Sequence, residues 1–327
     1  MAEDMPGGAP TAAEGNSFGT AAYGGEAWSQ RTAPHAAEIG GHWADCGIAN
    51  EWAPLTAVLL SAPGRALAAA GNEADRNQLL APVDLGLAAA EHARMADAYR
   101  AAGVTVLEVA PSTTHPNQMF CADLFVMTPE GAILARPAST VRAGEEVAVA
   151  ACLAAARVPI LMTLRGSATF EGADLMWLDA GCAIIGRGMR TNDAAIEQIG
   201  GLLGAMGVET LAVDMPFGTM HLMGMLRILD RDLAIAWPRR TPHAAVVALR
   251  ERGYRVAFLP DLGEADTNTA MNVVTLGPRR ILMPANPAAR AFYESLGVAV
   301  TETPTAELRK AAGAVGCLSG VVARARA

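Results

Sequence analysis

One pattern occurs four times along this chain, and it limits the folds that the sequence can adopt. The four stretches are DLFVMTPEGAILARP from Asp123, DLMWLDAGCAIIGRG from Asp174, GMLRILDRDLAIAWP from Gly224 and MNVVTLGPRRILMPA from Met271. Each has two apolar runs separated by a turn rich in Gly, Pro or Asp, which is the pattern of a β-hairpin. The spacing is roughly 50 residues, at the upper end of the range that indicates a propeller-like array.

A helical pattern and then a short apolar run follow every hairpin. The helical segments are GEEVAVAACLAAA, TNDAAIEQIGGLLGAMG, TPHAAVVALRERG and NPAARAFYESLG. Helix starts are expected at Thr191-Asn192-Asp193 and at Thr241-Pro242, and helix ends at Gly207, Gly253 and Gly297. The runs VPILMT, VETLAVDM, YRVAFLP and VAVTETP would each add a third strand. Every unit therefore predicts a ββαβ module.

The segments outside the repeat supply a fifth module in two pieces. WAPLTAVLLSAPG predicts a strand, LAAAEHARMADAYRAAG a helix and VTVLEVAP a second strand. The remaining strand would come from CLSGVVARA near the C-terminus, with Cys317 as its first residue. The sequence thus predicts an α/β fold, a five-bladed α/β propeller of ββαβ modules with pseudo-fivefold symmetry.

Composition and charge narrow the class of protein. Residues 1–40 are rich in Gly and Ala and are expected to be a tail, and residues 41–327 a single catalytic domain. The net charge of −8 argues against nucleic acid or an anionic membrane as partner, and no apolar run approaches the length of a membrane span. Five widely spaced cysteines and the absence of signal-peptide features predict a cytoplasmic protein, and a homo-oligomer remains open.

The repeat places chemically active residues at equivalent positions, at the start of each first strand. They are Asp123, Glu171 with Asp174, His221, Asn268 or Asn272, and Cys317. Residues at equivalent positions around a fivefold axis would face one channel. A thiol, an imidazole and carboxylates together are what nucleophilic catalysis needs: a nucleophile, a proton carrier and groups that hold a cation.

Structural roles compete with this interpretation. A lone cysteine is usually a small buried apolar residue, and Cys152 and Cys182 are interpreted in that way. A histidine between methionines is often a core residue, and Met220, Met223 and Met225 are expected in a strand core. Arginines near strand ends are ordinarily solvated; here they are Arg136, Arg142, Arg187 and Arg190.

The stretches EGAD-LMWLDAG-CAIIGRGMRTN, HLMG and GCLSG together resemble the guanidine-modifying, or pentein, superfamily. Its members include arginine deiminase, glycine amidinotransferase and dimethylarginine dimethylaminohydrolase. The resemblance runs from Cys46 to the end of the chain. It implies a five-bladed propeller of ββαβ modules, which agrees with the fold that the repeat predicts.

The resemblance also implies roles for individual residues. Cys317 resembles the nucleophile of the superfamily, His221 its general acid and base, and Glu171 the carboxylate that supports both substrate and histidine. Asp123 resembles the aspartate that binds the guanidine, and Arg142 and Arg190 resemble anchors of a substrate carboxylate. Asp174 and Met223 are also expected beside the substrate. No metal or organic cofactor is implied.

Three departures from the superfamily pattern bear on the substrate. Met223 stands where deiminases carry Asp, Ala122 where a charged residue precedes the aspartate, and EGAD replaces EGGD. The leading hypothesis is a hydrolase that cleaves a non-peptide C–N bond of a substituted guanidine through a thiouronium-like intermediate on the cysteine. Because a carboxylate after His221 and a charge before Asp123 are both missing, a substrate less cationic than arginine is indicated, and hydrolysis of 2-nitroimidazole with release of nitrite is an alternative. Amidine transfer to an amine and a non-catalytic binding role also remain open.

Overall fold

The computed structural model describes residues 17–326, and for residues 264–266 it describes the backbone only. Contacts divide the chain into two units between Glu38 and Ile39. The first unit contains the short helix α1 (His35–Glu38). The second contains every strand and all the residues of the candidate site. Between residues 17 and 326, no helix is long and apolar enough to cross a membrane.

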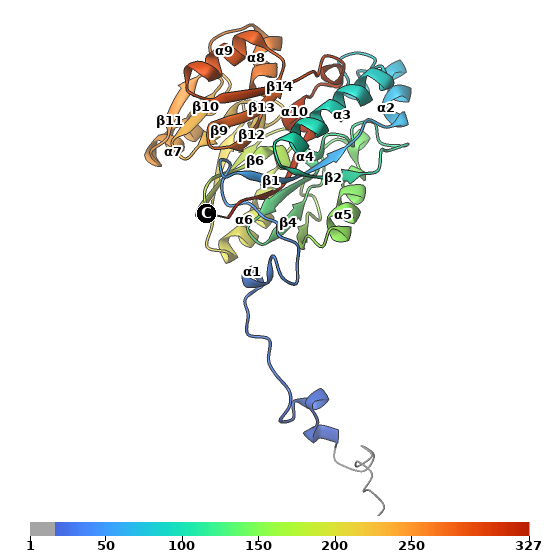
Figure 1. Cartoon of the computed structure of the whole chain (residues 1–327), viewed down its shortest axis with the longest axis vertical. Coiled ribbons are helices and arrows are strands. Elements are labelled where there is room, and N and C mark those ends of the chain that lie inside the picture. Colours follow the sequence, from blue (N-terminus) through green and yellow to red (C-terminus); the bar gives the residue numbers. More distant parts are fainter. Residues whose placement is uncertain (1–16, 327) are drawn as a thin grey trace, which may run out of the picture. The chain divides into compact units, whose positions relative to one another are not determined.

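The second unit is built from five three-stranded sheets that follow one plan (Figure 1). In four of them an antiparallel hairpin is followed by a helix and a strand parallel to the middle one. These blades are β3 (Phe125–Thr128), β4 (Gly131–Leu134), α5 (Glu145–Ala155) and β5 (Ile160–Thr163); β6 (Leu175–Asp179), β7 (Cys182–Arg187), α6 (Asp193–Ala205) and β8 (Glu209–Asp214); β9 (Leu226–Asp230), β10 (Leu233–Ala236), α7 (His243–Glu251) and β11 (Arg255–Phe258); and β12 (Val274–Gly277), β13 (Arg280–Pro284), α9 (Pro287–Ser295) and β14 (Ala299–Thr303). The predicted ββαβ modules are confirmed.

The fifth blade joins segments from the two ends of the unit. Strand β1 (Leu55–Ser61) pairs in parallel with β2 (Thr105–Val109), and α3 (Leu85–Ala101) connects them. On its other edge β1 pairs antiparallel with β15 (Gly320–Arg324), which confirms the predicted closure of the ring. Cys317, however, is not part of the strand as predicted. It lies in the short helix α10 (Val315–Leu318) that precedes β15.

Local sequence signals explain where the helices begin and end. Asn192 caps α6 by accepting a hydrogen bond from the backbone of Ala195, as its side chain favours at this position. Gly207, Gly253 and Gly297 follow α6, α7 and α9 with φ of 77°, 83° and 76°, a left-handed conformation that glycine adopts without steric cost. These predicted helix boundaries are confirmed.

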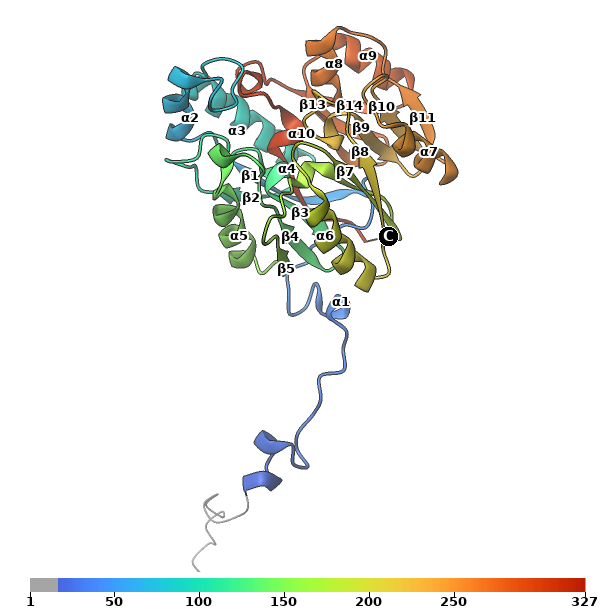
Figure 2. The same ribbon diagram turned by 180° about the vertical axis from the view of Figure 1, so that it is seen from behind.

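A short helical segment precedes the first strand of every blade. The segments are α4 (Cys121–Leu124), the 3₁₀ helices η5 (Gly172–Asp174) and η6 (Leu222–Gly224), α8 (Glu264–Met271) and α10. Helix α10 contacts α4, α4 contacts η5, η5 contacts η6 and η6 contacts α8. Figures 1 and 2 both show α10 beside α4, although the two are far apart in the sequence. The segments therefore gather in one place, each in contact with the next.

Three predicted placements are wrong. Asp123 and its counterparts lie in or beside these helical turns, because the chain must bend before it enters each first strand. Met220 is 40% exposed and Met223 is half-buried in η6, so of the three methionines only Met225 is buried, and it lies just before β9. Cys182 is buried as predicted, whereas Cys152 is only partly buried.

Candidate active site

The short helical segments bring four of the predicted residues together. Asp123 lies in α4, Glu171 directly precedes η5, His221 directly precedes η6 and Cys317 lies in α10. Asp123, Glu171 and His221 are buried, and Cys317 is half-buried. Residues from four blades thus meet where the helical segments gather.

His221 lies between two carboxylates. Its Nε2 atom is 2.7 Å from Oε2 of Glu171, and its Nδ1 atom is 3.7 Å from Oδ1 of Asp123. Burial alone would lower the pKa of His221, but the negative charges of Asp123 and Glu171 outweigh it and raise the pKa. Burial alone would raise the pKa of Glu171. The hydrogen bond and charge of His221, together with the charges of Arg142 and Arg190, outweigh burial and lower the pKa. The imidazole is therefore held protonated against an ionised glutamate.

Two buried arginines complete this charged cluster. Arg142 is 3% exposed, and its Nη1 atom lies 2.7 Å from Oδ2 of Asp123 and 3.2 Å from Oε2 of Glu171. Its Nε atom donates to Oε2 of Glu145 at 3.0 Å. Arg190 donates from Nη1 to Oε1 of Glu171 at 3.1 Å. These two arginines are thus not the solvated strand ends that their positions ordinarily indicate, because buried carboxylates compensate their charge.

Asp174 is buried and links the segment of Thr191 to the segment that follows His221. Its Oδ2 atom accepts a hydrogen bond from the Thr191 hydroxyl at 2.7 Å, and Oδ1 accepts from the backbone N–H of Leu222 at 3.0 Å. Burial raises the pKa of Asp174 to about 6. Since Leu222 follows His221 in the chain, Asp174 fixes the backbone that carries the imidazole. The structure gives it this positioning contact, and the expected contact with substrate stays a prediction.

Cys317 is held by one asparagine. Asn272 donates from Nδ2 to Sγ of Cys317 at 3.1 Å, while its Oδ1 accepts from the backbone N–H groups of Gly316 and Cys317 at 2.7 and 3.2 Å. Burial and the charge of Asp123 raise the pKa of the thiol, and the hydrogen bond from Asn272 works against that rise. Asn272 is one of the two asparagines that the repeat placed in this register, and it is the one in contact with the sulfur.

Two cavities border Cys317. The larger, about 170 Å³, is also lined by His221, Met223, Trp237 and Arg240. The smaller, about 20 Å³, is lined on its inner side by Asp123, Arg142 and Arg190. The Oδ1 atom of Asp123 is buried and accepts no hydrogen bond from residues 17–326, so it is available to a donor on a ligand. The thiol therefore lies between the charged side chains of the smaller cavity and the larger cavity, which can hold a small molecule.

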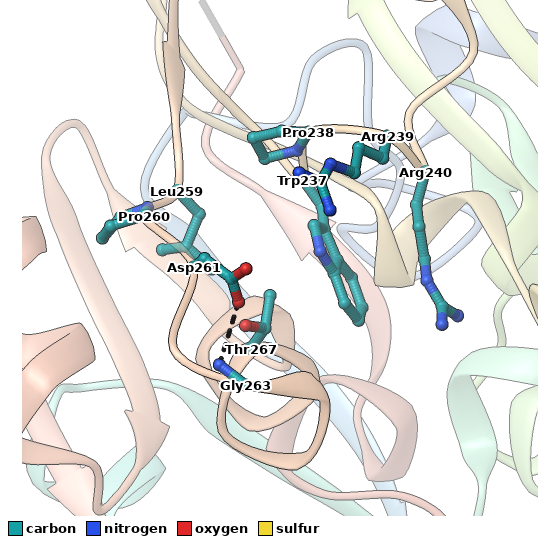
Figure 3. A pocket seen from close by; sticks show the side chains of 9 residues that line it. All are labelled: Trp237, Pro238, Arg239, Arg240, Leu259, Pro260, Asp261, Gly263 and Thr267. Carbon is teal, nitrogen blue, oxygen red and sulfur yellow. Dashed lines mark hydrogen bonds between the residues drawn. The ribbon is translucent and has the colours of Figure 1, made fainter.

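A further pocket of about 340 Å³ (Figure 3) shares Trp237 and Arg240 with the larger cavity. The guanidinium of Arg240 stacks over the indole ring, 4.7 Å from its centroid, and donates to the backbone oxygen of Gly218 at 3.2 Å. The far wall includes Asp261 and Thr267. No sequence signal marked Trp237 or Arg240 as site residues, because Trp237 only lies near the end of the hairpin stretch that begins at Gly224 and Arg240 follows in the loop after it.

The cluster also contains three metal-type donors. One donor atom each of Asp123, Glu171 and His221 lies within 4.8 Å of the others. Arg142 and Arg190 already donate to the two carboxylates and balance their charge. This donor set therefore suits proton transfer and binding of N–H groups better than a divalent cation, which would face two guanidinium groups.

Comparison with known proteins places these features in a family. The family model described as "N,N dimethylarginine dimethylhydrolase, eukaryotic" matches residues 67–271, a range that contains Asp123, Glu171 and His221 but ends before Cys317. A dimethylarginine dimethylaminohydrolase from Streptomyces coelicolor is 28% identical over 238 residues, or 72% of this chain and 86% of that protein. The one from Pseudomonas aeruginosa is 24% identical over 238 residues, or 72% and 89%.

Solved structures share the fold. The Pseudomonas aeruginosa enzyme, as a cysteine-to-serine variant with citrulline, aligns with a TM-score of 0.69 at 22% identity, covering 82% of this chain and 99% of that one. An amidinotransferase of saxitoxin biosynthesis from Microseira wollei aligns with a TM-score of 0.73 at 15% identity, covering 86% and 98%. The predicted five-bladed propeller is thereby confirmed. Since residues 67–271 are more than half of the 327 residues, the chain belongs to the dimethylarginine dimethylaminohydrolase family of the pentein superfamily.

Proposed function

We propose that this protein is a hydrolase that cleaves a non-peptide C–N bond at a guanidine-type carbon, with Cys317 as nucleophile. The observation that carries the proposal is the ion pair between His221 and Glu171, because the imidazole of that pair lines the same cavity as the thiol. Relatives named dimethylarginine dimethylaminohydrolases support the reaction class. We also propose that residues 41–327 form the catalytic domain and that residues 1–40 lie outside it.

The first half of the reaction follows from the geometry. Oδ1 of Asp123 accepts an N–H of the substrate and orients its central carbon toward Cys317. Cys317 releases its proton to solvent, and the resulting thiolate attacks that carbon and forms a C–S bond. His221 gives its proton to the nitrogen that leaves, so that the C–N bond breaks with a neutral amine as product. A thiouronium-like adduct remains on the sulfur.

The second half uses the same histidine as a base. After the first proton transfer His221 is neutral, and it removes a proton from a water molecule that attacks the adduct. The C–S bond then breaks, the electron pair returns to sulfur and a urea-type product leaves. Glu171 stabilises the imidazolium each time it forms, because its carboxylate is 2.7 Å from Nε2.

The charge balance of the site favours a second candidate, a neutral ring such as 2-nitroimidazole. Asp123 and Glu171 are already hydrogen-bonded to Arg142 and Arg190, so the inner wall offers little uncompensated negative charge to a cation. Met223, where related deiminases carry an aspartate, adds an uncharged side chain to the larger cavity. In this version the same attack expels nitrite, and no substrate carboxylate is needed to bind the arginines.

The test offers asymmetric dimethylarginine and 2-nitroimidazole separately, with Cys317→Ser as control, and identifies products by mass spectrometry. Citrulline with dimethylamine supports the leading proposal, and nitrite supports the second. Both proposals require that the Cys317→Ser variant forms neither set of products. A variant that keeps wild-type turnover would exclude Cys317 as nucleophile, and turnover only after addition of an amine acceptor would indicate an amidinotransferase.

A further inference from the structure

A buried arginine on β9 lies beside the turn that carries Cys317. Arg227 is 7% exposed, and its Nε atom donates to the backbone oxygen of Met271 at 2.7 Å. Its Nη2 atom is buried and has no hydrogen-bond partner within the described part of the chain. A buried donor without a partner destabilises the folded protein, so its retention calls for a compensating interaction.

Gly316 shows how closely this guanidinium approaches the nucleophile. A Cβ atom at position 316 would lie 2.4 Å from Nη2 of Arg227, so a larger residue there would push the guanidinium away. Glycine at this position lets the guanidinium lie against the backbone that directly precedes Cys317. Arg227 and Cys317 also line the same cavity of about 170 Å³.

Arg227 is also connected to the asparagine that binds the sulfur. The carbonyl that accepts from Arg227 belongs to Met271, and the next residue, Asn272, donates to Sγ of Cys317 at 3.1 Å. The guanidinium of Arg227 thus fixes the backbone next to Asn272 and also places a positive charge close to the Cys317 thiol. Burial lowers the pKa of Arg227, but a guanidinium titrates so far above neutrality that it stays charged.

The other charged groups near the thiol line the two cavities that border it. Those facing Cys317 are Asp123, Arg142 and Arg190 across the smaller cavity, and His221 and Arg240 across the larger. The groups facing Arg227 are Cys317, Glu51 and the phenols of Tyr99 and Tyr293, and burial raises the pKa of both phenols, which keeps them neutral. Glu51 also faces the buried Arg324. The thiolate is therefore the main counter-charge that Arg227 can gain during the reaction.

We propose that Arg227 supplies the positive charge that stabilises the Cys317 thiolate. This charge allows the nucleophile to attack substrates that carry no positive charge of their own. The inference rests on Cys317 as the nucleophile of the proposed function. In a site without this charge, the cation of a guanidinium substrate would have to stabilise the thiolate. With Arg227 in place, a neutral amidine-type ring can be attacked, because the stabilising charge belongs to the enzyme.

The test measures the ionisation of Cys317 without any substrate. The rate of alkylation by iodoacetamide is followed as a function of pH in the full-length protein, and the peptide carrying Cys317 is quantified by mass spectrometry. For Arg227→Gln we expect the midpoint of the profile to rise by about 1–3 pH units, the effect of an opposite charge at close range. Arg227→Lys, which keeps the charge, should restore most of that shift.

Arg324→Gln is the matched control. Arg324 is a second buried arginine, but it donates to the backbone oxygens of Ala53 and Thr275 rather than facing the thiol, so its loss should leave the midpoint unchanged. Gly316→Ala is a second variant that retains Arg227 but displaces its guanidinium, and it should shift the midpoint in the same direction. Thermal unfolding of each variant confirms that the folded protein is being titrated.

An unchanged midpoint in folded Arg227→Gln would overturn the proposal, and so would an equal shift in Arg324→Gln. Because alkylation requires no turnover, a shift in a protein that hydrolyses neither candidate substrate would uphold the role of Arg227 and count against the proposed function. Where turnover is observed, Arg227→Gln should lose more activity with 2-nitroimidazole than with asymmetric dimethylarginine. The opposite order would contradict the inference about neutral substrates.

Discussion

Glu171 Oε2 lies 2.7 Å from Nε2 of His221, and both side chains are buried. A carboxylate in this position stabilises the imidazolium and fixes the orientation of the ring, so that its other nitrogen points toward Asp123. The pair comes from two blades whose helical turns, η5 and η6, are in contact. The geometry of this pair therefore depends on how neighbouring blades pack.

Glu171→Gln should lower the pKa of His221, because the amide removes the negative charge that favours the imidazolium. We expect kcat to fall by about 10²–10⁴, the usual contribution of a general acid–base group. The measurement combines NMR titration of His221 with steady-state kinetics. Glu294→Gln, an exposed change on α9, is the control. A normal kcat with a lowered histidine pKa would show that proton transfer by His221 is not rate-limiting.

His221→Ala should slow both proton transfers and allow the covalent adduct on Cys317 to accumulate. The expected result is a mass increase on the protein in intact-mass spectra after incubation with substrate, with turnover reduced by about 10²–10⁴. The double variant with Cys317→Ser should show no such increase. A wild-type steady-state rate for His221→Ala would refute its assignment as acid and base.

The raised pKa of His221 makes part of the stability dependent on pH. Its pKa rises from 6.5 to about 9 in the folded protein, so folding favours the protonated form. This contribution is fully present below the unfolded pKa of 6.5 and is lost as pH rises through about 9. The measurement is the difference in free energy of unfolding between wild type and His221→Gln across that window. A difference that grows as pH rises would contradict the ion pair.

Met223→Asp should shift selectivity toward cationic substrates. The new carboxylate would face the cavity that Met223 shares with Cys317 and His221, and attraction at that range favours a cation by about tenfold or more. The measurement is the ratio of kcat/KM for asymmetric dimethylarginine and 2-nitroimidazole. Met189→Asp adds the same charge at an exposed position and serves as control. A ratio that moves toward the neutral ring would exclude this explanation of selectivity.

Trp177 joins two blades and should be important for stability. Its ring is fully buried on β6, and its indole N–H donates to the backbone oxygen of Met127 on β3 at 3.0 Å. Trp177→Ala should lower the free energy of unfolding by about 3–5 kcal/mol. Trp177→Phe should cost about 1–3 kcal/mol, because the Met127 oxygen loses its partner. Urea unfolding measures both, and an unchanged midpoint in Trp177→Ala would show that the blades do not depend on this contact.

The blades could be predicted from sequence because each signal is local. A hairpin, a capped helix such as the one that begins after Asn192, and a third strand recur with the same spacing, and their register indicates which residues meet. The sequence could not show that Arg142 is buried, since that depends on Asp123 and Glu145, which reach it through folding. Arg227 left one signal: it is a charged residue in the apolar strand MLRILD, where a solvated position is not expected.

The pairing of β15 with β1 has a consequence for how the protein comes into being. Strand β1 is synthesised early, and its outer edge stays unpaired until β15 emerges, with α10 and Cys317 just ahead of it. Asp123, Glu171 and His221 all precede Cys317 in the chain, so they are synthesised before it. If Cys317 is the nucleophile as proposed, a nascent chain holds the charged residues of the site but not the thiol, and the site is complete only when the ring closes.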